Sequence, residues 1–211
     1  MRVLALDTAL AVCSVAVLDG AAVRAAISEP MVRGHAERIA PMAQAAMIES
    51  GLAFPDLDRI VVTIGPGSFT GVRVGLAFAR ALALALNAPC VGVSTLEALA
   101  LEAGAAGARA AAIHAPGGVY FALYADGAAQ VAPLLCDAAQ AAAHLAAHPG
   151  ARVRGPAAAL FGGEDAPAPD AAALARLGAA RAAAASPPRP LYLRHPDFKR
   201  WTPPAAPAGA P

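Results

Sequence analysis

The hydrophobic and polar positions of the first hundred residues predict three strands, followed by helices and strands in turn. Short apolar runs predict the first strands at 3–7, 13–18 and 21–28, and Asp19-Gly20 is a strong hairpin signal. From residue 36 the apolar period becomes helical, and Gly51 is placed to end a helix at 50. The same patterns predict a strand at 59–64, a helix at 70–86, a strand at 90–93 and a helix at 95–103.

This order, β-β-β-α-β-α-β-α, is the half-domain pattern of actin, sugar kinases and heat-shock chaperone ATPases, whereas doubly wound folds usually alternate from the start. We therefore expect an α/β protein with the actin-like ATPase fold and two lobes, the second reduced. The glycines at 104–107 suggest the boundary. The predicted divisions are a first lobe over 1–105, a smaller, degenerate second lobe over 106–201 and a disordered tail over 202–211.

The second half has weaker patterns. Residues 109–114 and 119–124 predict a hairpin around Pro116-Gly117-Gly118, and alanine-rich helices are expected at 138–147 and 170–185. Together they suggest a reduced copy of the first half.

Composition limits the possible roles of the chain. Its 211 residues are 58% hydrophobic, enough for a buried core, and the net charge of +1 gives no overall field that attracts nucleic acid or acidic membranes. The three cysteines lie far apart, as expected for free thiols in a reducing compartment. The longest apolar run contains Arg73 and Arg80, which argues against a membrane span. We expect a cytoplasmic protein without a membrane partner.

The segment GPGSFTG, residues 65–71, lies between a predicted strand and a predicted helix. Glycines allow a sharp turn and a close approach of the backbone, and a helix start offers N–H groups to anions. No lysine follows the glycines, so the segment is not a P-loop, and it also lacks the third glycine of a dinucleotide-binding loop. Tight helix packing and phosphate binding both remain open for Gly65, Gly67, Ser68, Thr70 and Gly71.

Asp7 and Thr8 end the first strand, where proteins of this superfamily can hold hydrated Mg²⁺ near a nucleotide's phosphates. A carboxylate that only caps the turn is the alternative. The apolar turn from Thr8 to Val12 has no glycine or lysine to bind phosphate. The second acidic turn of a nucleotide-splitting protein would fall at His114, and imidazole is a poor Mg²⁺ ligand. The sequence therefore predicts a degenerate site with no catalytic or metal-binding residue.

Two further clusters could carry chemistry. His144 and His148 have the spacing of zinc ligands, but the glutamate of HExxH and a third ligand are missing, which favours an exposed helix. Near the C-terminus basic and aromatic residues are mixed, which suits either nucleic acid or a solvated segment packed on the domain. That segment contains Arg189, Tyr192, Arg194, Phe198, Lys199, Arg200 and Trp201.

The two longest predicted helices of the first lobe carry apolar stripes. The helix at 70–86 is apolar nearly all round, so one face can pack on the sheet while the other needs cover. That cover is either the second lobe or a bundle formed by two helices from each of two subunits. The interface predicted for such a bundle contains His35, Ile39, Met42, Ala46, Met47, Val72, Arg73, Leu76, Ala79, Arg80 and Ala83.

Several segments together resemble the bacterial TsaB family. They are LALDTALAVCSVAVL (4–18), RGHAERIAPM (33–42), GPGSFTGVRVGLAFARALAL (65–84), GVSTLEALA (92–100) and PLYLR (190–194). The resemblance is nearly continuous over residues 3–100 and resumes near the end. It implies a role in forming N6-threonylcarbamoyladenosine beside the anticodon of ANN-decoding tRNAs.

In that family the related subunit TsaD carries the metal and transfers the threonylcarbamoyl group, and an ATPase, TsaE, joins the two. The resemblance therefore implies a noncatalytic dimerisation or scaffold subunit that binds a TsaD homologue and reaches tRNA through the complex. It implies a homodimer as a further state, with the same two helices at the dimer surface. It also implies that this chain alone binds no cofactor, with ATP and a metal in the partner subunits.

The chain departs from the family pattern at two places. The Asp, Arg and Glu of the family's DARxGEVY hairpin are absent from residues 113–120, and Ile64 stands where many relatives have Arg. A stand-alone ATPase or small-molecule kinase of the same superfamily is one alternative function, but it needs Mg²⁺ ligands beyond Asp7. A peptidase is another, and it needs a metal or nucleophile cluster.

Overall fold

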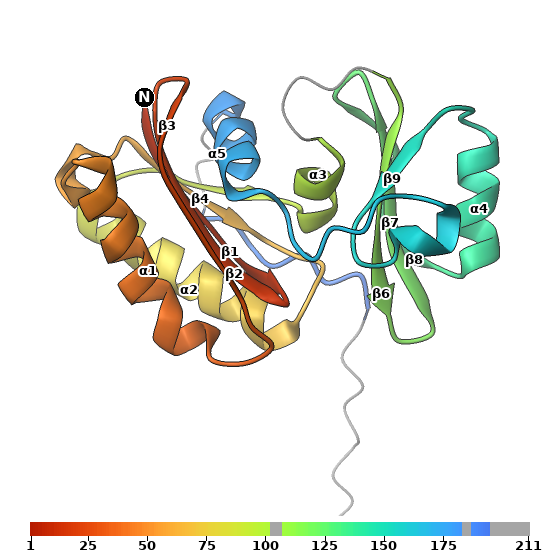
Figure 1. Cartoon of the computed structure of the whole chain (residues 1–211), viewed down its shortest axis with the longest axis horizontal. Coiled ribbons are helices and arrows are strands. Elements are labelled where there is room, and N and C mark those ends of the chain that lie inside the picture. Colours follow the sequence, from red (N-terminus) through yellow and green to blue (C-terminus); the bar gives the residue numbers. More distant parts are fainter. Residues whose placement is uncertain (102–106, 183–186, 195–211) are drawn as a thin grey trace, which may run out of the picture.

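The computed structural model describes residues 1–101, 107–182 and 187–194, and it contains two β-sheets that lie beside each other (Figure 1). The sheets have the strand orders β3-β2-β1-β4-β5 and β8-β7-β6-β9. The first sheet is formed by β1 (Arg2–Leu10), β2 (Val12–Asp19), β3 (Ala22–Pro30), β4 (Arg59–Thr63) and β5 (Cys90–Val93). Its β1, β4 and β5 are parallel, whereas β2 and β3 pair antiparallel to their neighbours.

The helices of the first half follow the predicted order, which is confirmed. They are α1 (His35–Ser50), the 3₁₀ turn η1 (Phe54–Asp56), α2 (Phe69–Leu86) and α3 (Thr95–Ala100). Gly51 ends α1 with a φ of 72°, a left-handed conformation that glycine adopts without strain. α2 begins one residue earlier than predicted because the Ser68 side chain caps it, accepting a hydrogen bond from the Gly71 N–H at 3.2 Å.

Helices cover both faces of the first sheet. α1 and α2 pack on one face through a core that includes Leu4, Leu6 and Met42. α5 (Ala171–Ala180) packs on the other face, against Val61 and Val91. The sequence assigned residues 171–180 to the second lobe, and this assignment is corrected by the packing. The boundary itself, at 105/106, touches residues outside the described ranges and stays a prediction.

The second sheet contains β6 (Arg109–Ala115), β7 (Gly118–Ala125), β8 (Ala128–Cys136) and β9 (Arg152–Arg154). The β6–β7 hairpin was predicted, whereas β8 and β9 were not. α4 (Ala138–Ala146) and the 3₁₀ turn η2 (Ala158–Phe161) cover its outer face, where Phe121 is fully buried. The helix predicted at 170–185 ends at Ala180.

An apolar cluster joins the two sheets. Leu96 and Leu99 of α3 pack between the sheets against Ile113 and Tyr124 of the second sheet, and Ala166 of the connection to α5 is buried among them. α3 therefore lies in the middle of the molecule, as Figure 1 shows.

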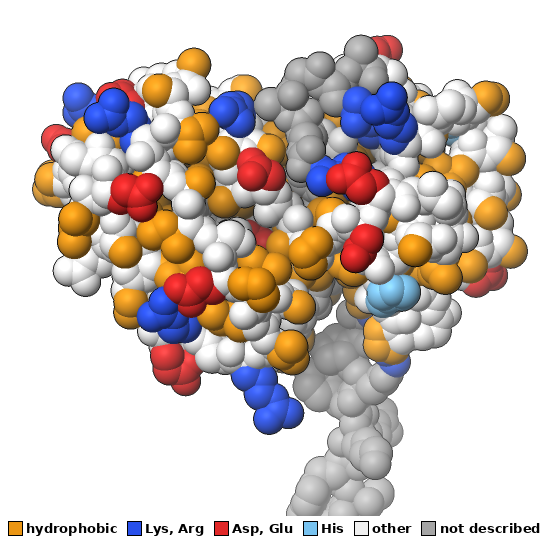
Figure 2. Space-filling model, viewed as in Figure 1, with side chains coloured by type: hydrophobic (Ala, Val, Ile, Leu, Met, Phe, Trp, Pro, Cys, Tyr) orange, Lys and Arg blue, Asp and Glu red, His pale blue; other side chains and the backbone are white. Residues whose placement is uncertain are grey.

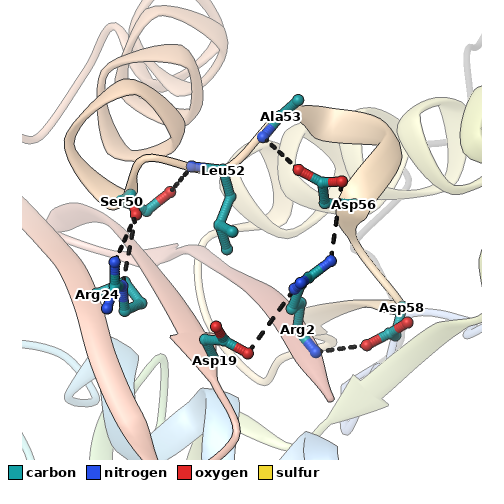
Figure 3. A network of polar contacts seen from close by, with 8 residues as sticks. All are labelled: Arg2, Asp19, Arg24, Ser50, Leu52, Ala53, Asp56 and Asp58. Carbon is teal, nitrogen blue, oxygen red and sulfur yellow. Dashed lines mark hydrogen bonds and ion pairs between the residues drawn. The ribbon is translucent and has the colours of Figure 1, made fainter.

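A polar network ties the start of β1 to neighbouring connections (Figure 3). The Arg2 guanidinium lies 3.8 Å from a carboxylate oxygen of Asp19 and 3.8 Å from one of Asp56, and the Arg2 backbone N–H donates to Asp58 at 2.6 Å. Ion pairs this exposed each stabilise a fold by less than about 1 kcal/mol. The network therefore adds little to the stability of the fold at this end of the central strand.

Among the described helices, only α2 is long and apolar enough to cross a membrane by length and composition alone. One of its faces packs on β1 and β4, with Val72, Leu76 and Ala79 nearly inaccessible. This packing is that of a core helix, which passes the same test.

Candidate functional site

Asp7 lies near the carboxyl end of β1 and is fully buried. Its Oδ1 accepts hydrogen bonds from Thr63 Oγ1 at 2.5 Å and from the Ala9 N–H at 3.0 Å. The turn predicted from Thr8 to Val12 is wrong, because β1 continues to Leu10, with an irregularity in its pairing after Asp7, and β2 begins at Val12. The carboxylate is consequently enclosed within the first lobe, where it contacts Thr63 of β4.

The surroundings of Asp7 disfavour its charged form. Its Oδ2 is buried and has no hydrogen-bond partner in the described part of the chain, and the same holds for the Oγ of Ser14, the residue opposite it on β2. Burial raises the pKa of the Asp7 carboxyl above its usual range, although the hydrogen bonds from Thr63 and Ala9 act against this. A carboxyl in this setting is a poor ligand for a hydrated cation.

The glycines of residues 65–71 bring the backbones of α2 and β1 into contact. A Cβ on Gly71 would lie 2.0 Å from the Thr8 carbonyl oxygen, and one on Gly67 would lie 2.3 Å from that of Ala9. Thr8 Oγ1 also donates to the Gly71 carbonyl at 2.7 Å. Of the two roles left open, the geometry favours tight packing, because these close approaches exclude any larger side chain.

Phosphate binding at the start of α2 stays a prediction. The Ser68 N–H donates to the Ala9 carbonyl at 2.7 Å, and the Gly71 N–H is taken by Ser68 Oγ. The Gly65 carbonyl accepts from Thr95 N–H at 2.8 Å, and Thr70 is exposed. Two amides that an anion could use therefore already have partners.

A hollow of about 470 Å³ opens where the two lobes meet at this end of β1. The β1–β2 turn, the loop before α2 and the β6–β7 hairpin surround it, and its polar side chains are His35, Ser68, His114 and Tyr120. Asp7 does not line it. His35 is mostly buried, and its Nε2 lies 3.1 Å from the Leu10 carbonyl oxygen, within hydrogen-bonding distance.

These residues do not fit a nucleotide with a divalent cation. Among the described residues that line it, the hollow has no carboxylate, lysine or arginine, and its hairpin contributes exposed His114 where an acid is needed. Within residues 1–101, 107–182 and 187–194, no three His, Cys, Asp or Glu side chains gather where they could hold a metal.

The predicted contact residues of α1 and α2 need correction. All of them except Arg73 and Arg80 are buried in the core of the first lobe. Periodicity identified an apolar stripe on each helix, but these stripes face the sheet. The buried members are His35, Ile39, Met42, Ala46, Met47, Val72, Leu76, Ala79 and Ala83.

The outward faces of the same helices present other residues. On α1, Ile48 is 74% exposed, and on α2, Leu84 is 84% exposed, with Ala77 and Ala81 also at the surface. Val74, Phe78, Leu82 and Leu86 remain partly buried beside them. Figure 2 shows hydrophobic side chains interspersed with charged ones over this part of the first lobe. The glycines of α2 were the available signal, because they mark the face that approaches the strands closely.

The segment 187–194 lies along α2. The Leu191 N–H donates to the Ile64 carbonyl at 2.7 Å, and Arg73 Nε donates to Tyr192 Oη at 2.9 Å. The Arg73 guanidinium lies 3.6 Å from the centre of the Phe69 ring, a cation–π contact. Part of the predicted basic and aromatic segment is thus packed on the first lobe. Its remaining members, Phe198, Lys199, Arg200 and Trp201, lie outside the described residues.

His144 and His148 do not converge on a common point. The His144 ring stacks on Phe121 with centroids 6.0 Å apart, and His148 Nδ1 lies 2.9 Å from the His144 carbonyl oxygen. Both side chains are therefore used in packing and in ending α4.

Comparisons with known proteins give a consistent set of relatives. The protein-family model "TsaD: tRNA N6-adenosine threonylcarbamoyltransferase" matches residues 27–150. The "tRNA threonylcarbamoyladenosine biosynthesis protein TsaB" of Escherichia coli is 43% identical over 128 residues, covering 59% of this chain and 55% of that protein. The Bacillus subtilis protein of the same description is 38% identical over 100 residues, covering 47% and 44%. The chain thus spans about half the length of these curated relatives.

Longer matches come from an uncharacterized protein and from solved structures. A Mycobacterium tuberculosis protein is 37% identical over 183 residues, covering 79% of this chain and 78% of that protein. The structure "YeaZ from Pseudomonas aeruginosa" has a TM-score of 0.72 at 29% identity and covers 85% of this chain and 92% of its own. An uncharacterized Pseudomonas aeruginosa protein, described as similar to peptidase YEAZ, has a TM-score of 0.76 at 30% identity, covering 92% and 99%.

Proposed function

This chain belongs to the TsaB family, and on that premise we propose that it is a noncatalytic subunit in the synthesis of N6-threonylcarbamoyladenosine in ANN-decoding tRNAs. Its fold is the α/β fold of the actin-like ATPases. In this proposal it binds a TsaD homologue, and a TsaE-type ATPase and the tRNA join through the complex. The ATP and the metal belong to those partner subunits.

The buried state of Asp7 is the observation that carries the noncatalytic part. In an ATP-splitting protein of this fold, a carboxylate at this position must reach a hydrated cation beside the phosphates. Here the carboxyl is inaccessible and hydrogen-bonded to Thr63, and the described residues that line the neighbouring hollow include no acid, lysine or arginine. Such a site supports a scaffold role over a stand-alone ATPase or kinase.

The outward faces of α1 and α2 are the proposed surface for TsaD. Both helices pack on the sheet, which holds them firmly in place. The exposed side chains of Ile48 and Leu84 give their outward faces an apolar character. Apolar side chains on paired helices suit packing against two helices of a related subunit. The same surface would serve a homodimer, which would then compete with TsaD for it.

Co-purification with the TsaD homologue of the same organism tests this proposal. Leu84→Asp and Ala77→Asp place a charge on the outward face of α2, where neither side chain supports the core. Leu160→Asp is the matched control, because Leu160 is 58% exposed on η2, in the second sheet's layer. We expect the complex with wild-type protein and with the control, and its loss with both α2 variants.

The other outcomes separate the parts of the proposal. A complex that survives both α2 variants would place the TsaD surface elsewhere. Failure of wild-type protein to bind TsaD would refute the subunit role. Magnesium-dependent ATP hydrolysis by the purified chain, lost in Asp7→Asn, would refute the noncatalytic role.

A further inference from the structure

Three arginines line up at one edge of the second sheet. Arg109 begins β6 and pairs in parallel register with Arg152 of β9, and Arg154 follows two residues later. Residues opposite each other in register, and residues two apart on a strand, point to the same face of a sheet. The three side chains therefore share one face, the face on which Ala111 and Ile113 meet α3.

These arginines line a hollow of about 450 Å³, separate from the hollow where the lobes meet. The end of η2 and the loop after it close its other side with Phe161, Gly162, Gly163 and Glu164. Figure 2 shows basic side chains gathered at the upper edge of the second lobe, with acidic ones below them. The volume is in the range of small-molecule sites, and several charged groups of one sign converge on it.

The charges of the lining residues do not balance. Glu164 is the one carboxylate among the described residues that line the hollow, and its Oε1 accepts from Arg154 at 2.9 Å. Arg109 and Arg152 form no ion pair with any residue that the structure describes, so two positive charges at the hollow have no described counterion. Arginine cannot release its proton at any ordinary pH, so this charge needs water or an anion as its partner.

Arg109 brings a buried hydrogen-bond donor to the same hollow. Its Nε is buried, and it has no hydrogen-bond partner among the residues that the structure describes. A buried donor of a charged group that makes no hydrogen bond destabilises the fold. An anion held in the hollow would offer acceptors to such a donor.

We propose that this hollow binds a phosphate group. A phosphate carries up to two negative charges, which match the two unbalanced cations, and its oxygens suit the fork of a guanidinium. The hollow exceeds the size of phosphate alone, so the rest of the ligand lies beside Phe161 and the two glycines. The phosphate comes from a small phosphorylated molecule or from an RNA backbone, and the proposal does not depend on TsaD binding.

Titration calorimetry on the full chain tests the site, with inorganic pyrophosphate and a short single-stranded RNA as separate probes. Arg152→Ala is the main variant, because Arg152 is exposed and its removal leaves the core intact. Arg109→Gln removes the second cation. Arg176→Ala is the matched control, since Arg176 is exposed on α5, away from the hollow.

We expect saturable binding to wild-type protein and to Arg176→Ala, and at least tenfold weaker binding to Arg152→Ala and Arg109→Gln. Arg152→Lys keeps the charge but loses the fork, and we expect an intermediate affinity. Pyrophosphate binding with this pattern identifies a small phosphorylated ligand, and the same pattern with RNA alone identifies backbone phosphate. No saturable binding of either probe at low salt, or equal affinity for all variants, would overturn the proposal. Thermal unfolding of each variant confirms that it is folded.

Discussion

Replacing Gly75 by alanine tests how closely α2 packs on β1. A Cβ at residue 75 would lie 2.4 Å from Thr8 Oγ1, whereas its next neighbours, Val62 Cγ2 and Thr8 Cβ, are at ordinary distances of 3.5 and 3.7 Å. The hydroxyl that would be displaced donates a buried hydrogen bond to the Gly71 carbonyl. The Thr8 Oγ1 atom is therefore the one neighbour among these that would clash with an alanine Cβ at residue 75.

The expected magnitudes follow from these contacts. Alanine gains about 1 kcal/mol in helix propensity over glycine, but forcing the hydroxyl aside costs about 1–3 kcal/mol, and losing its hydrogen bond costs about 1 kcal/mol more. Gly75→Ala should therefore destabilise the protein by about 2 kcal/mol, which lowers Tm by roughly 4–8 °C at this chain length. Thr8→Ala alone should cost about 1–2 kcal/mol, because only the hydrogen bond and a methyl group are lost.

The double variant carries the test. With the hydroxyl gone, Thr8→Ala/Gly75→Ala has room for the new Cβ, so its stability should return to within about 1 kcal/mol of wild type. Thr8→Ser/Gly75→Ala is the matched control, because serine keeps the oxygen and should give no rescue. The assay is urea unfolding followed by circular dichroism, analysed as a double-mutant cycle. Additive effects of Thr8→Ala and Gly75→Ala would refute the packing argument.

Three further predictions follow from buried groups of the first lobe. The pKa of Asp7 is raised in the folded state, so the folded protein binds this proton more tightly than the unfolded chain, and the free energy of unfolding should fall as pH rises from the ordinary carboxyl pKa toward the raised one. Asp7→Asn keeps an oxygen that can accept from Thr63, and it should remove this fall when urea unfolding is measured at a series of pH values. Identical pH profiles for the wild type and the variant would contradict the assignment to Asp7. Burial raises the pKa of Cys13 and of Cys90 to about 11. Because the thiolate is the reactive form, these two thiols in native protein at pH 8 should react with a disulfide reagent at least about a hundredfold more slowly than in urea-unfolded protein. Fast reaction of either thiol in native protein would show that it is not buried. The Arg59 guanidinium donates to three carbonyls at the end of α5, so Arg59→Met should lower the free energy of unfolding by about 2–3 kcal/mol. Because the guanidinium is partly buried, the difference between wild type and variant should remain largely unchanged in 0.5 M salt.

The strands and helices of the first hundred residues were predictable because each has a clear period and a clear stop. Asp19-Gly20 and Gly51 lie where the structure ends an element, and β5 has the predicted bounds of 90–93. β8 was missed although Asp126-Gly127 precedes it with positive φ at both residues, the signal of a tight hairpin. β9 has three residues, too few for any period to appear.

The candidate site was less predictable, because it depends on which face of an element meets the core. The pattern of α2 is apolar on nearly every side, so periodicity could not distinguish the stripe of Val72 and Leu76 from that of Leu84. Asp7 was correctly placed on the first strand, although that strand runs three residues beyond it, and its hydrogen bond from Thr63 comes from a residue 56 positions further along the chain. The arginine hollow depends likewise on pairing between β6 and β9, which no local pattern predicts.

α5 and the segment after it are synthesised last, although they complete the packing of the first sheet. The ribosome releases all five strands of the first sheet long before it reaches residue 171, yet one face of that sheet stays uncovered until α5 emerges. Gly178 then fits so closely on Val61 that any Cβ would lie 2.3 Å from that side chain, and Leu191 follows by pairing with Ile64. A nascent chain stalled or cleaved before residue 171 therefore exposes an apolar sheet face, which makes it a target for chaperones and for aggregation. The N-terminal sheet, which is synthesised first, is therefore fully covered only after the C-terminal helix has been synthesised.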